Sequence, residues 1–302
     1  MRRAQSSRAG LVASTVVASR PAAALAAAGV TPRRSRGQNF LVQPRVADRI
    51  VALAELGAND AVIEIGPGLG ILTERIAAAP VRRLILIELD ERLAARLMER
   101  YAGDARVNVI NRDFLSLGRD EIAVGAPLKI VGNLPFNVAA AILERLAAWR
   151  GEIVRMVLMF QREVGERIRA RPGSRDYGAL SVYTALYWEI TSHFRVGAGC
   201  FHPRPKVDAE VLAFAPRPAA PVDAAGERAL LATIRAAFSA PRKTLRNALG
   251  RTAGLPAGAL DAALAAAAID PAARAATLAV EDLSRLAEAL MRARAAIGDR
   301  DA

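Results

Sequence analysis

The stretch "VIEIGPGLGILTERI", residues 62–76, decides the fold of this 302-residue chain. It contains a short apolar strand, a glycine-rich turn and the start of a helix. Gly66, Gly68 and Gly70 let the backbone approach a ligand closely, and the first turn of the helix offers unpaired N–H groups and the positive end of its dipole. The stretch therefore predicts a ligand-binding turn after the first strand of an α/β sheet.

Strand-like and helical segments alternate on both sides of this turn. The further strand-like runs are short and apolar, and they lie at 83–88, 107–111, 128–132 and 155–160. Helical patterns occupy 90–102 and 136–149 between them. Because such strands are apolar on both faces, the pattern predicts a parallel sheet covered by helices, with its ligand crevice at the carboxyl ends of the strands.

The pattern changes after residue 180. Two longer and more polar runs, 187–196 and 207–216, predict an antiparallel hairpin at the sheet edge. The proline-rich stretch 215–223 predicts a linker, and the rest of the chain is helical in pattern. We therefore expect an α/β domain at 37–215 and a small all-helical domain at 216–302.

The composition restricts the partners and the chemistry. A formal net charge of +12 indicates a polyanionic partner, although the first 38 residues alone contain seven arginines and no acid. We interpret residues 1–36 as a basic, disordered leader, with a mitochondrial targeting segment as the alternative. The single cysteine, Cys200, excludes an intrachain disulfide, and two histidines argue against a His-based metal site or a Ser/His triad. No uninterrupted apolar run is long enough to span a membrane.

Two acids follow neighbouring strands. Glu88, at the end of the second strand, can accept both hydroxyls of a ribose, and Asp113, after the third, can accept from an adenine amino group while Phe114 packs beside the ring. Each alone is as consistent with an ordinary solvated acid at a strand end. Position 71 is Ile71 rather than glycine, which weakens a dinucleotide interpretation. Together with the glycine turn, the acids describe a site for an adenosine without pyrophosphate, and S-adenosylmethionine (AdoMet) fits that description.

The stretch "VGNLPFNV", residues 131–138, follows the fourth strand and faces the same crevice. If the Asn133 side-chain oxygen and the Leu134 carbonyl each accept one N–H of an aromatic amine, its nitrogen becomes more tetrahedral and its lone pair is freed to attack a methyl sulfonium. Pro135 stiffens the turn, and Phe136 offers a face on which a flipped-out base can stack. Stacking of this kind stabilises binding by about 1–3 kcal/mol per base. We therefore assign catalysis to residues 133–136.

These motifs resemble the ribosomal RNA adenine N6,N6-dimethyltransferases, in particular their bacterial small-subunit branch. The resemblance runs from about Gly37 to Leu290 and includes "GQNFL" (37–41), "EIGPGLGILT" (64–73), "IELD" (87–90), "NLPFN" (133–137), "FQREVGERI" (160–168), "YGALSV" (177–182), "FHPRPKVDAEV" (201–211), "RKTLRNAL" (242–249) and "IDPAARAATLAVEDLSRLAEAL" (269–290).

The resemblance implies a Rossmann-like, seven-stranded AdoMet-dependent methyltransferase domain and a helical RNA-contacting domain. The residues it implies for cofactor contact, taken with the glycine turn, are Asn39, Leu41, Gly66, Gly68, Glu88, Asp113 and Asn133. It implies that Phe201 closes over the flipped adenine opposite Phe136. The implied substrate is a pair of adjacent adenines in the 3′-terminal hairpin loop of 16S rRNA, in an immature small subunit, and we expect a cytoplasmic monomer without a metal.

Two departures and several alternatives accompany this interpretation. Phe136 stands where bacterial members commonly have tyrosine, and Ala209 or Glu210 stands where a serine is usual, which predicts a looser pocket wall. The alternatives are a macrolide-resistance type 23S rRNA methylase, a mitochondrial relative, a non-catalytic assembly checkpoint factor and, more distantly, a dehydrogenase. For RNA contact we expect a basic cluster of Arg242, Lys243 and Arg246 on one helix, with Lys206 as a second candidate.

Overall fold

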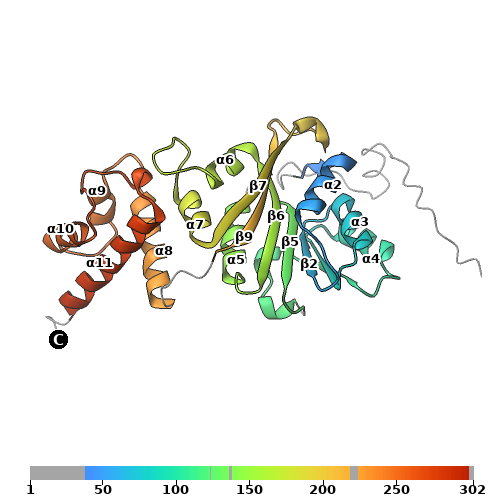
Figure 1. The fold of residues 1–302 in the computed structure, drawn as a ribbon, viewed down its shortest axis with the longest axis horizontal. Coiled ribbons are helices and arrows are strands. Elements are labelled where there is room, and N and C mark those ends of the chain that lie inside the picture. Colours follow the sequence, from blue (N-terminus) through green and yellow to red (C-terminus); the bar gives the residue numbers. More distant parts are fainter. Residues whose placement is uncertain (1–37, 123, 136–137, 218–223, 299–302) are drawn as a thin grey trace, which may run out of the picture.

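The computed structural model describes residues 38–122, 124–135, 138–217 and 224–298 (Figure 1). The predicted leader, 1–36, and Phe136 lie outside these ranges. Within them, one seven-stranded sheet forms the centre of the α/β part, and a group of helices follows it. In sheet order the strands are β4 (Val107–Asn111), β3 (Arg83–Glu88), β2 (Ala61–Ile65), β5 (Leu128–Asn133), β6 (Ile153–Gln161), β9 (Ala209–Pro216) and β7 (Trp188–Val196).

The five strands from β4 to β6 run parallel, as their sequence pattern predicts. Alternate side chains of β2 enter different apolar clusters: Val62 belongs to one, and Ile63 and Ile65 to the other. Helices therefore cover both faces, since both faces of the central strands are apolar. These helices are α2 (Pro44–Leu53), α3 (Ile71–Ala78), α4 (Glu91–Arg100) and α5 (Ala139–Ala148).

The expected antiparallel hairpin at the sheet edge is confirmed. Strand β9 lies between β6 and β7 and pairs antiparallel with both, so that β7 is the edge strand. The helices that precede β7 are α6 (Arg162–Ile168) and α7 (Ala179–Tyr187). A second, two-stranded sheet pairs β1 (Phe40–Leu41) with β8 (Phe201–His202), which joins the start of the described chain to the β7–β9 connection.

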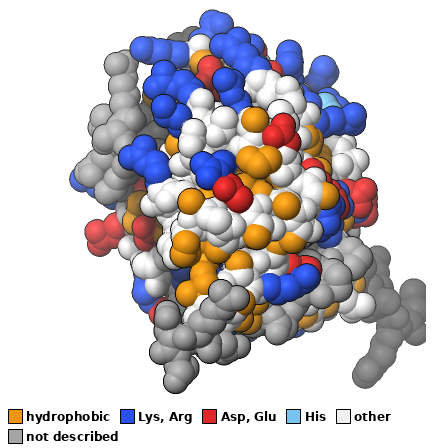
Figure 2. Space-filling view, turned by 90° about the vertical axis from the view of Figure 1, so that its left-hand side faces the viewer, with side chains coloured by type: hydrophobic (Ala, Val, Ile, Leu, Met, Phe, Trp, Pro, Cys, Tyr) orange, Lys and Arg blue, Asp and Glu red, His pale blue; other side chains and the backbone are white. Residues whose placement is uncertain are grey.

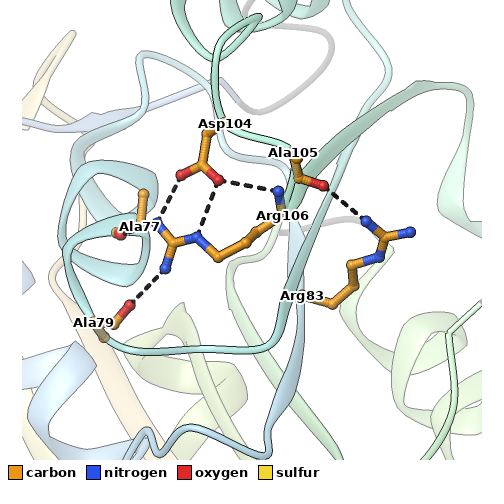
Figure 3. Close-up of polar contacts among 6 residues, drawn as sticks. All are labelled: Ala77, Ala79, Arg83, Asp104, Ala105 and Arg106. Carbon is orange, nitrogen blue, oxygen red and sulfur yellow. Dashed lines mark hydrogen bonds and ion pairs between the residues drawn. The ribbon is translucent and has the colours of Figure 1, made fainter.

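Arg106, just before β4, fastens the end of α3 to the sheet (Figure 3). Its guanidinium donates to the carbonyls of Ala77 (2.8 Å) and Ala79 (3.1 Å), where the last turn of α3 lacks intrahelical donors. Asp104 holds the same guanidinium through both carboxylate oxygens, at 2.7 and 3.0 Å. The bond between Arg83 and the Ala105 carbonyl (2.8 Å) fixes the neighbouring loop. This arrangement keeps α3, and with it the glycine turn at its other end, in register with the sheet.

The C-terminal helices lie at one end of the molecule, beyond α7 (Figure 1). They are α8 (Ala224–Phe238), α9 (Leu245–Gly250), α10 (Ala257–Ala266) and α11 (Val280–Gly298). Four 3₁₀ turns complete the described elements: Phe114–Ser116, Arg119–Glu121, Ala198–Cys200 and Ala275–Thr277. The apolar cluster on the α5 face of the sheet continues through α7 into these helices. Among the helices described, none has both the length and the apolar character needed to cross a membrane.

One expectation about this region is wrong. Arg242 and Lys243 do not share a helix with Arg246, because α9 begins only at Leu245. The Thr244 hydroxyl accepts from the Asn247 N–H at 3.4 Å and thereby caps the helix at that point. Arg242 and Lys243 instead lie in the turn between α8 and α9, where both are exposed.

Candidate active site

A cavity of about 240 Å³ opens at the carboxyl ends of β2, β3 and β5. The structure brings together at its wall nine residues that the sequence assigned to the site: Asn39, Leu41, Gly66, Gly68, Glu88, Asp113, Asn133, Leu134 and Pro135. They come from five separate segments of the chain. Parallel strands place their carboxyl ends at one edge of the sheet, which is why these distant segments meet.

The glycine turn has the backbone conformation that its composition predicts. Gly66, Gly68 and Gly70 have φ values of +69°, +58° and +84°, in the left-handed region that residues with a Cβ avoid. At Gly68 the space is also restricted, because a Cβ there would lie 2.9 Å from the Phe40 ring. The turn is closed by a bond from the Gly70 N–H to the Pro67 carbonyl at 2.9 Å. Its path along the cavity wall therefore depends on glycine.

Glu88 lies at the end of β3, buried, with both carboxylate oxygens engaged. Oε2 accepts from the Gly68 N–H at 3.0 Å and Oε1 from the Asp90 N–H at 2.9 Å. Burial raises the pKa of Glu88, and these two N–H groups partly oppose the shift. Each carboxylate oxygen has capacity for a further bond. The side chain is therefore fixed in place and still able to accept two hydroxyl groups.

Glu64 is a wall residue to which the sequence analysis assigned no role. Its carboxyl, on the penultimate residue of β2, is 1% exposed and accepts from the Thr73 hydroxyl at 2.7 Å. Burial raises its pKa to about 8, with a smaller contribution from the charge of Glu88, while the Thr73 hydrogen bond lowers it. The one sequence signal for this residue is an acid inside an otherwise apolar strand, and that signal shows neither its burial nor its bond to Thr73.

On the β4 side the wall combines an acid with apolar surface. Asp113 accepts from the Leu115 N–H at 2.9 Å and so caps the turn that begins at Phe114. Phe114 is buried and stacks edge-on against Trp149, with 5.3 Å between ring centroids. Leu89, beside Glu88, lines the cavity yet is 53% exposed. This rim fits a flat apolar ring that carries a polar edge.

The Asn133 side chain has one defined orientation. Its Nδ2 donates to the Asn39 carbonyl at 3.0 Å, and this bond assigns the nitrogen and leaves Oδ1 as the acceptor end of the amide. The next residue, Leu134, is buried, and its N–H donates to the Met159 carbonyl at 3.0 Å. The loop after β5 is therefore tied to β6 on one side and to the segment before β1 on the other.

These residues fit AdoMet. The fixed carboxylate of Glu88 suits the two ribose hydroxyls, and the rim around Asp113 and Phe114 suits adenine. The acidic side chains on the cavity wall, Glu64, Glu88 and Asp113, suit the positively charged sulfonium of AdoMet. The parallel sheet, the glycine turn and this cavity define a Rossmann-like AdoMet-dependent methyltransferase.

Comparison with known proteins identifies the family. The model of the ribosomal RNA adenine dimethylase family matches residues 29–292, and the chain belongs to that family. Relatives named ribosomal RNA small subunit methyltransferase A share 39% identity over 270 residues in Geobacter sulfurreducens, covering 88% of this chain and 97% of the relative. In Moorella thermoacetica the identity is 41% over 271 residues, covering 87% and 93%.

Two solved structures are similar in fold. A dimethyladenosine transferase from Plasmodium falciparum has a TM-score of 0.72 at 23% identity and covers 83% of this chain and 97% of its own. The 23S rRNA methyltransferase ErmE has a TM-score of 0.62 at 29% identity, with coverage of 84% and 100%. The predicted α/β methyltransferase fold is thus confirmed.

Other predicted site residues do not reach the cavity wall. Phe201 is 5% exposed and packs in the apolar cluster on the α2 face, so its contact with substrate stays a prediction. Lys206 is exposed between β8 and β9, and Arg246 pairs with Asp261 through both carboxylate oxygens. Arg242 and Lys243 lie with Arg246 in the C-terminal part.

Ala209 or Glu210 stands where the family usually has a serine, and Glu210 has a structural role away from the cavity. The Glu210 carboxylate is fully buried beneath α6 and pairs with Arg169 at 2.8 Å. Gly165 leaves the room for it, because a Cβ there would lie 2.5 Å from Glu210 Oε2. Neither Ala209 nor Glu210 lines the cavity, so the structure gives no support to a looser pocket wall at this position.

Proposed function

We propose that this protein dimethylates the exocyclic N6 of two adjacent adenines in the 3′-terminal hairpin loop of 16S rRNA. We further propose that it acts in the cytoplasm, as a monomer, on an immature small subunit. The relatives named above carry the small subunit in their names, which supports this substrate over 23S rRNA. The observation that carries the proposed chemistry is the bond from Asn133 Nδ2 to the Asn39 carbonyl.

The proposed mechanism depends on two acceptors held at the end of β5. Asn133 Oδ1 and the Leu134 carbonyl each accept one N–H of the adenine amine, which makes the nitrogen more tetrahedral and frees its lone pair. When bound, AdoMet supplies the methyl group on a positively charged sulfur. Because Asn133 and Leu134 are already held by the Asn39 and Met159 carbonyls, little reorganisation is needed when substrate arrives. Pro135 restricts the turn, and Phe136 would stack on the base.

We propose that the α/β part carries out catalysis and that the helical part, 216–302, contributes to RNA binding. Exposed basic side chains gather along one edge of the C-terminal end, at the top of Figure 2. Two backbone bonds bring the segments that carry them together: Gly173 N–H to the Ala276 carbonyl (2.8 Å) and Leu245 N–H to the Ala273 carbonyl (2.7 Å). The exposed basic side chains on these segments are Arg171, Arg175, Arg242, Lys243 and Arg274, and together they form this basic edge.

The basic edge suits a phosphate backbone better than the cluster expected from the sequence. Arg246 is neutralised by Asp261, whereas Arg242 and Lys243 are exposed in the adjoining turn. Arginine and lysine side chains on an exposed edge bind phosphates without reading sequence, and they release counterions when they do so. We therefore place the RNA helix along this edge and the target loop at the cavity.

The test is methyl transfer by the full chain onto small subunits and onto 23S rRNA, each lacking the modification. Primer extension across both rRNAs is expected to stop at two adjacent adenines near the 3′ end of 16S rRNA. Asn133→Ala is expected to remove these stops while RNA binding remains, and the control Asn108→Ala, at an exposed asparagine in β4, is expected to keep them.

Three results would contradict the proposal in different ways. Stops found only in 23S rRNA would favour the macrolide-resistance type of methylase. Full methylation by the Asn133→Ala protein would refute the role of the amide. Wild-type protein that binds immature subunits without transferring methyl groups would favour a checkpoint factor.

A further inference from the structure

Glu64 is a buried carboxyl on the cavity wall for which the proposed chemistry has no use. It projects from the penultimate residue of β2, near the carboxyl end of the strand, and is 1% exposed. The Thr73 hydroxyl, 2.7 Å away, is its hydrogen-bond donor, and no arginine or lysine in the described part of the chain forms an ion pair with it. An isolated acid in such a position is costly to keep ionised.

The charged groups around Glu64 do not offset its negative charge. Glu88 on β3 lies close enough to repel it, and Glu74 follows Thr73 on α3. From α4, Arg100 pairs with Glu74 at 3.4 Å, and the adjoining Tyr101 hydroxyl is buried without a partner among the described residues.

The rest of the wall is also acidic. Glu88 and Asp113 line the cavity with Glu64, while the basic wall residue, Arg112, pairs with Glu121. The cavity is therefore suited to a ligand with excess positive charge.

The methyl donor and its product differ in charge at one atom. AdoMet has a positively charged sulfonium, and S-adenosylhomocysteine has a neutral thioether, while the rest of the two molecules is the same. We propose that Glu64 makes the cavity prefer the donor over the product, by ionising when the donor is bound and by holding a proton when the product is bound. This inference rests on the proposed function, because it takes AdoMet as the methyl donor.

The proton balance follows from the burial of Glu64. With a pKa of about 8, the carboxyl of the free protein holds its proton at neutral pH. A bound cation favours the carboxylate, so the proton passes to the buffer when the donor binds. After methyl transfer the sulfur is neutral, the carboxylate loses that support and a proton returns from solvent. Glu64 thus helps product to leave and the next donor to enter.

The expected size of the effect follows from the ionised fraction. A carboxyl with a pKa of about 8 is about 1% ionised at pH 6 and about half ionised at pH 8. If the donor binds only the ionised form and the product only the protonated form, donor affinity rises about 50-fold and product affinity falls about twofold over this range, so their ratio rises by at most about 100-fold. Because the protonated form also binds donor, we expect about a tenfold rise in the ratio of the two affinities.

The experiment is isothermal titration of the full chain with AdoMet and with S-adenosylhomocysteine at pH 6 and pH 8. Wild type is expected to show the tenfold rise in the affinity ratio, and Glu64→Gln is expected to show a constant ratio apart from the titration of the ligands themselves. That titration is identical for the two proteins and cancels in their comparison. Thr73→Val removes the hydroxyl that favours the carboxylate, so it is expected to move the rise to higher pH.

The possible results of this experiment distinguish failure of the inference about Glu64 from failure of the proposed function. An equal rise in wild type and Glu64→Gln, or a ratio that does not change with pH in wild type, would overturn the inference and leave the proposed function standing. Failure of wild type to bind AdoMet at either pH would overturn both. If Glu64→Gln does not fold, Thr73→Val decides: an unmoved pH dependence refutes the role of Glu64, and an upward shift supports it.

Discussion

Replacing Gly68 by alanine tests two reasons why the turn needs glycine at this position: the positive φ and the lack of room for a Cβ. A residue with a Cβ at the φ of +58° found here costs about 1–2 kcal/mol of folding free energy. The added Cβ would also lie 2.9 Å from the ring of Phe40, a buried side chain that must shift, and such overpacking costs typically about 1–3 kcal/mol. Gly68→Ala should therefore reduce the free energy of unfolding by about 2–5 kcal/mol.

Gly254→Ala is the matched control. Gly254 has a similar φ of +63°, but no atom lies within 4 Å of the position its Cβ would take. The free energy of unfolding of Gly254→Ala should therefore fall only by the conformational cost of the positive φ, about 1–2 kcal/mol. Urea unfolding of both variants measures the difference, and titration with AdoMet measures the consequence for the site, since Gly68 also donates to Glu88. Equal destabilisation of the two variants, or unchanged AdoMet affinity in Gly68→Ala, would refute the reasoning.

Three further predictions concern other parts of the molecule. Arg106→Ala should lower the free energy of unfolding by about 1–2 kcal/mol, because the last turn of α3 loses its donors; an unchanged urea midpoint would contradict this. The double variant Arg171→Ala with Arg175→Ala should weaken RNA binding and reduce the slope of log affinity against log salt by about 1 per arginine; an unchanged slope would remove these two residues from the proposed RNA surface. Glu64→Gln should become more stable relative to wild type as the pH rises from about 4.5 to about 8, because only the folded wild type keeps its proton in that range. Thermal unfolding at pH 5 and pH 8 measures this, and a constant difference between the two proteins would contradict it.

The sequence predicted the sheet well because its signal is local. The segments 61–65, 83–88 and 107–111 begin and end as expected, and β5 and β6 are longer than their predicted runs by a few residues at most. Short strands that are apolar on both faces and bounded by polar turns leave few other pairings. The same locality explains the cavity, since a glycine turn, two acids and an asparagine at strand ends converge in any parallel sheet.

The sequence predictions were wrong or incomplete where contacts between segments distant in the chain determine the structure. The start of α9 depends on a cap at Thr244, and the pairing of Arg246 depends on Asp261 from another helix, so the spacing of basic residues alone misplaced the cluster. Glu64 received no role because an acid inside a strand pattern indicates nothing about what surrounds it. Its burial and its bond to Thr73 are visible only in three dimensions.

The segment before α2 shows how a short piece of chain can complete a site built on a sheet. The Asn39 carbonyl orients the amide of Asn133, and the Phe40 ring packs where Gly68 leaves room. Strand β1 is itself held by antiparallel pairing with β8. Phe201, in β8, therefore supports the cavity through this pairing even though it does not line it. Because the glycine turn and the loop after β5 both contact this one segment, a shift of β1 would disturb the proposed cofactor wall and the proposed acceptor amide of Asn133 together, and neither could adjust independently of the other.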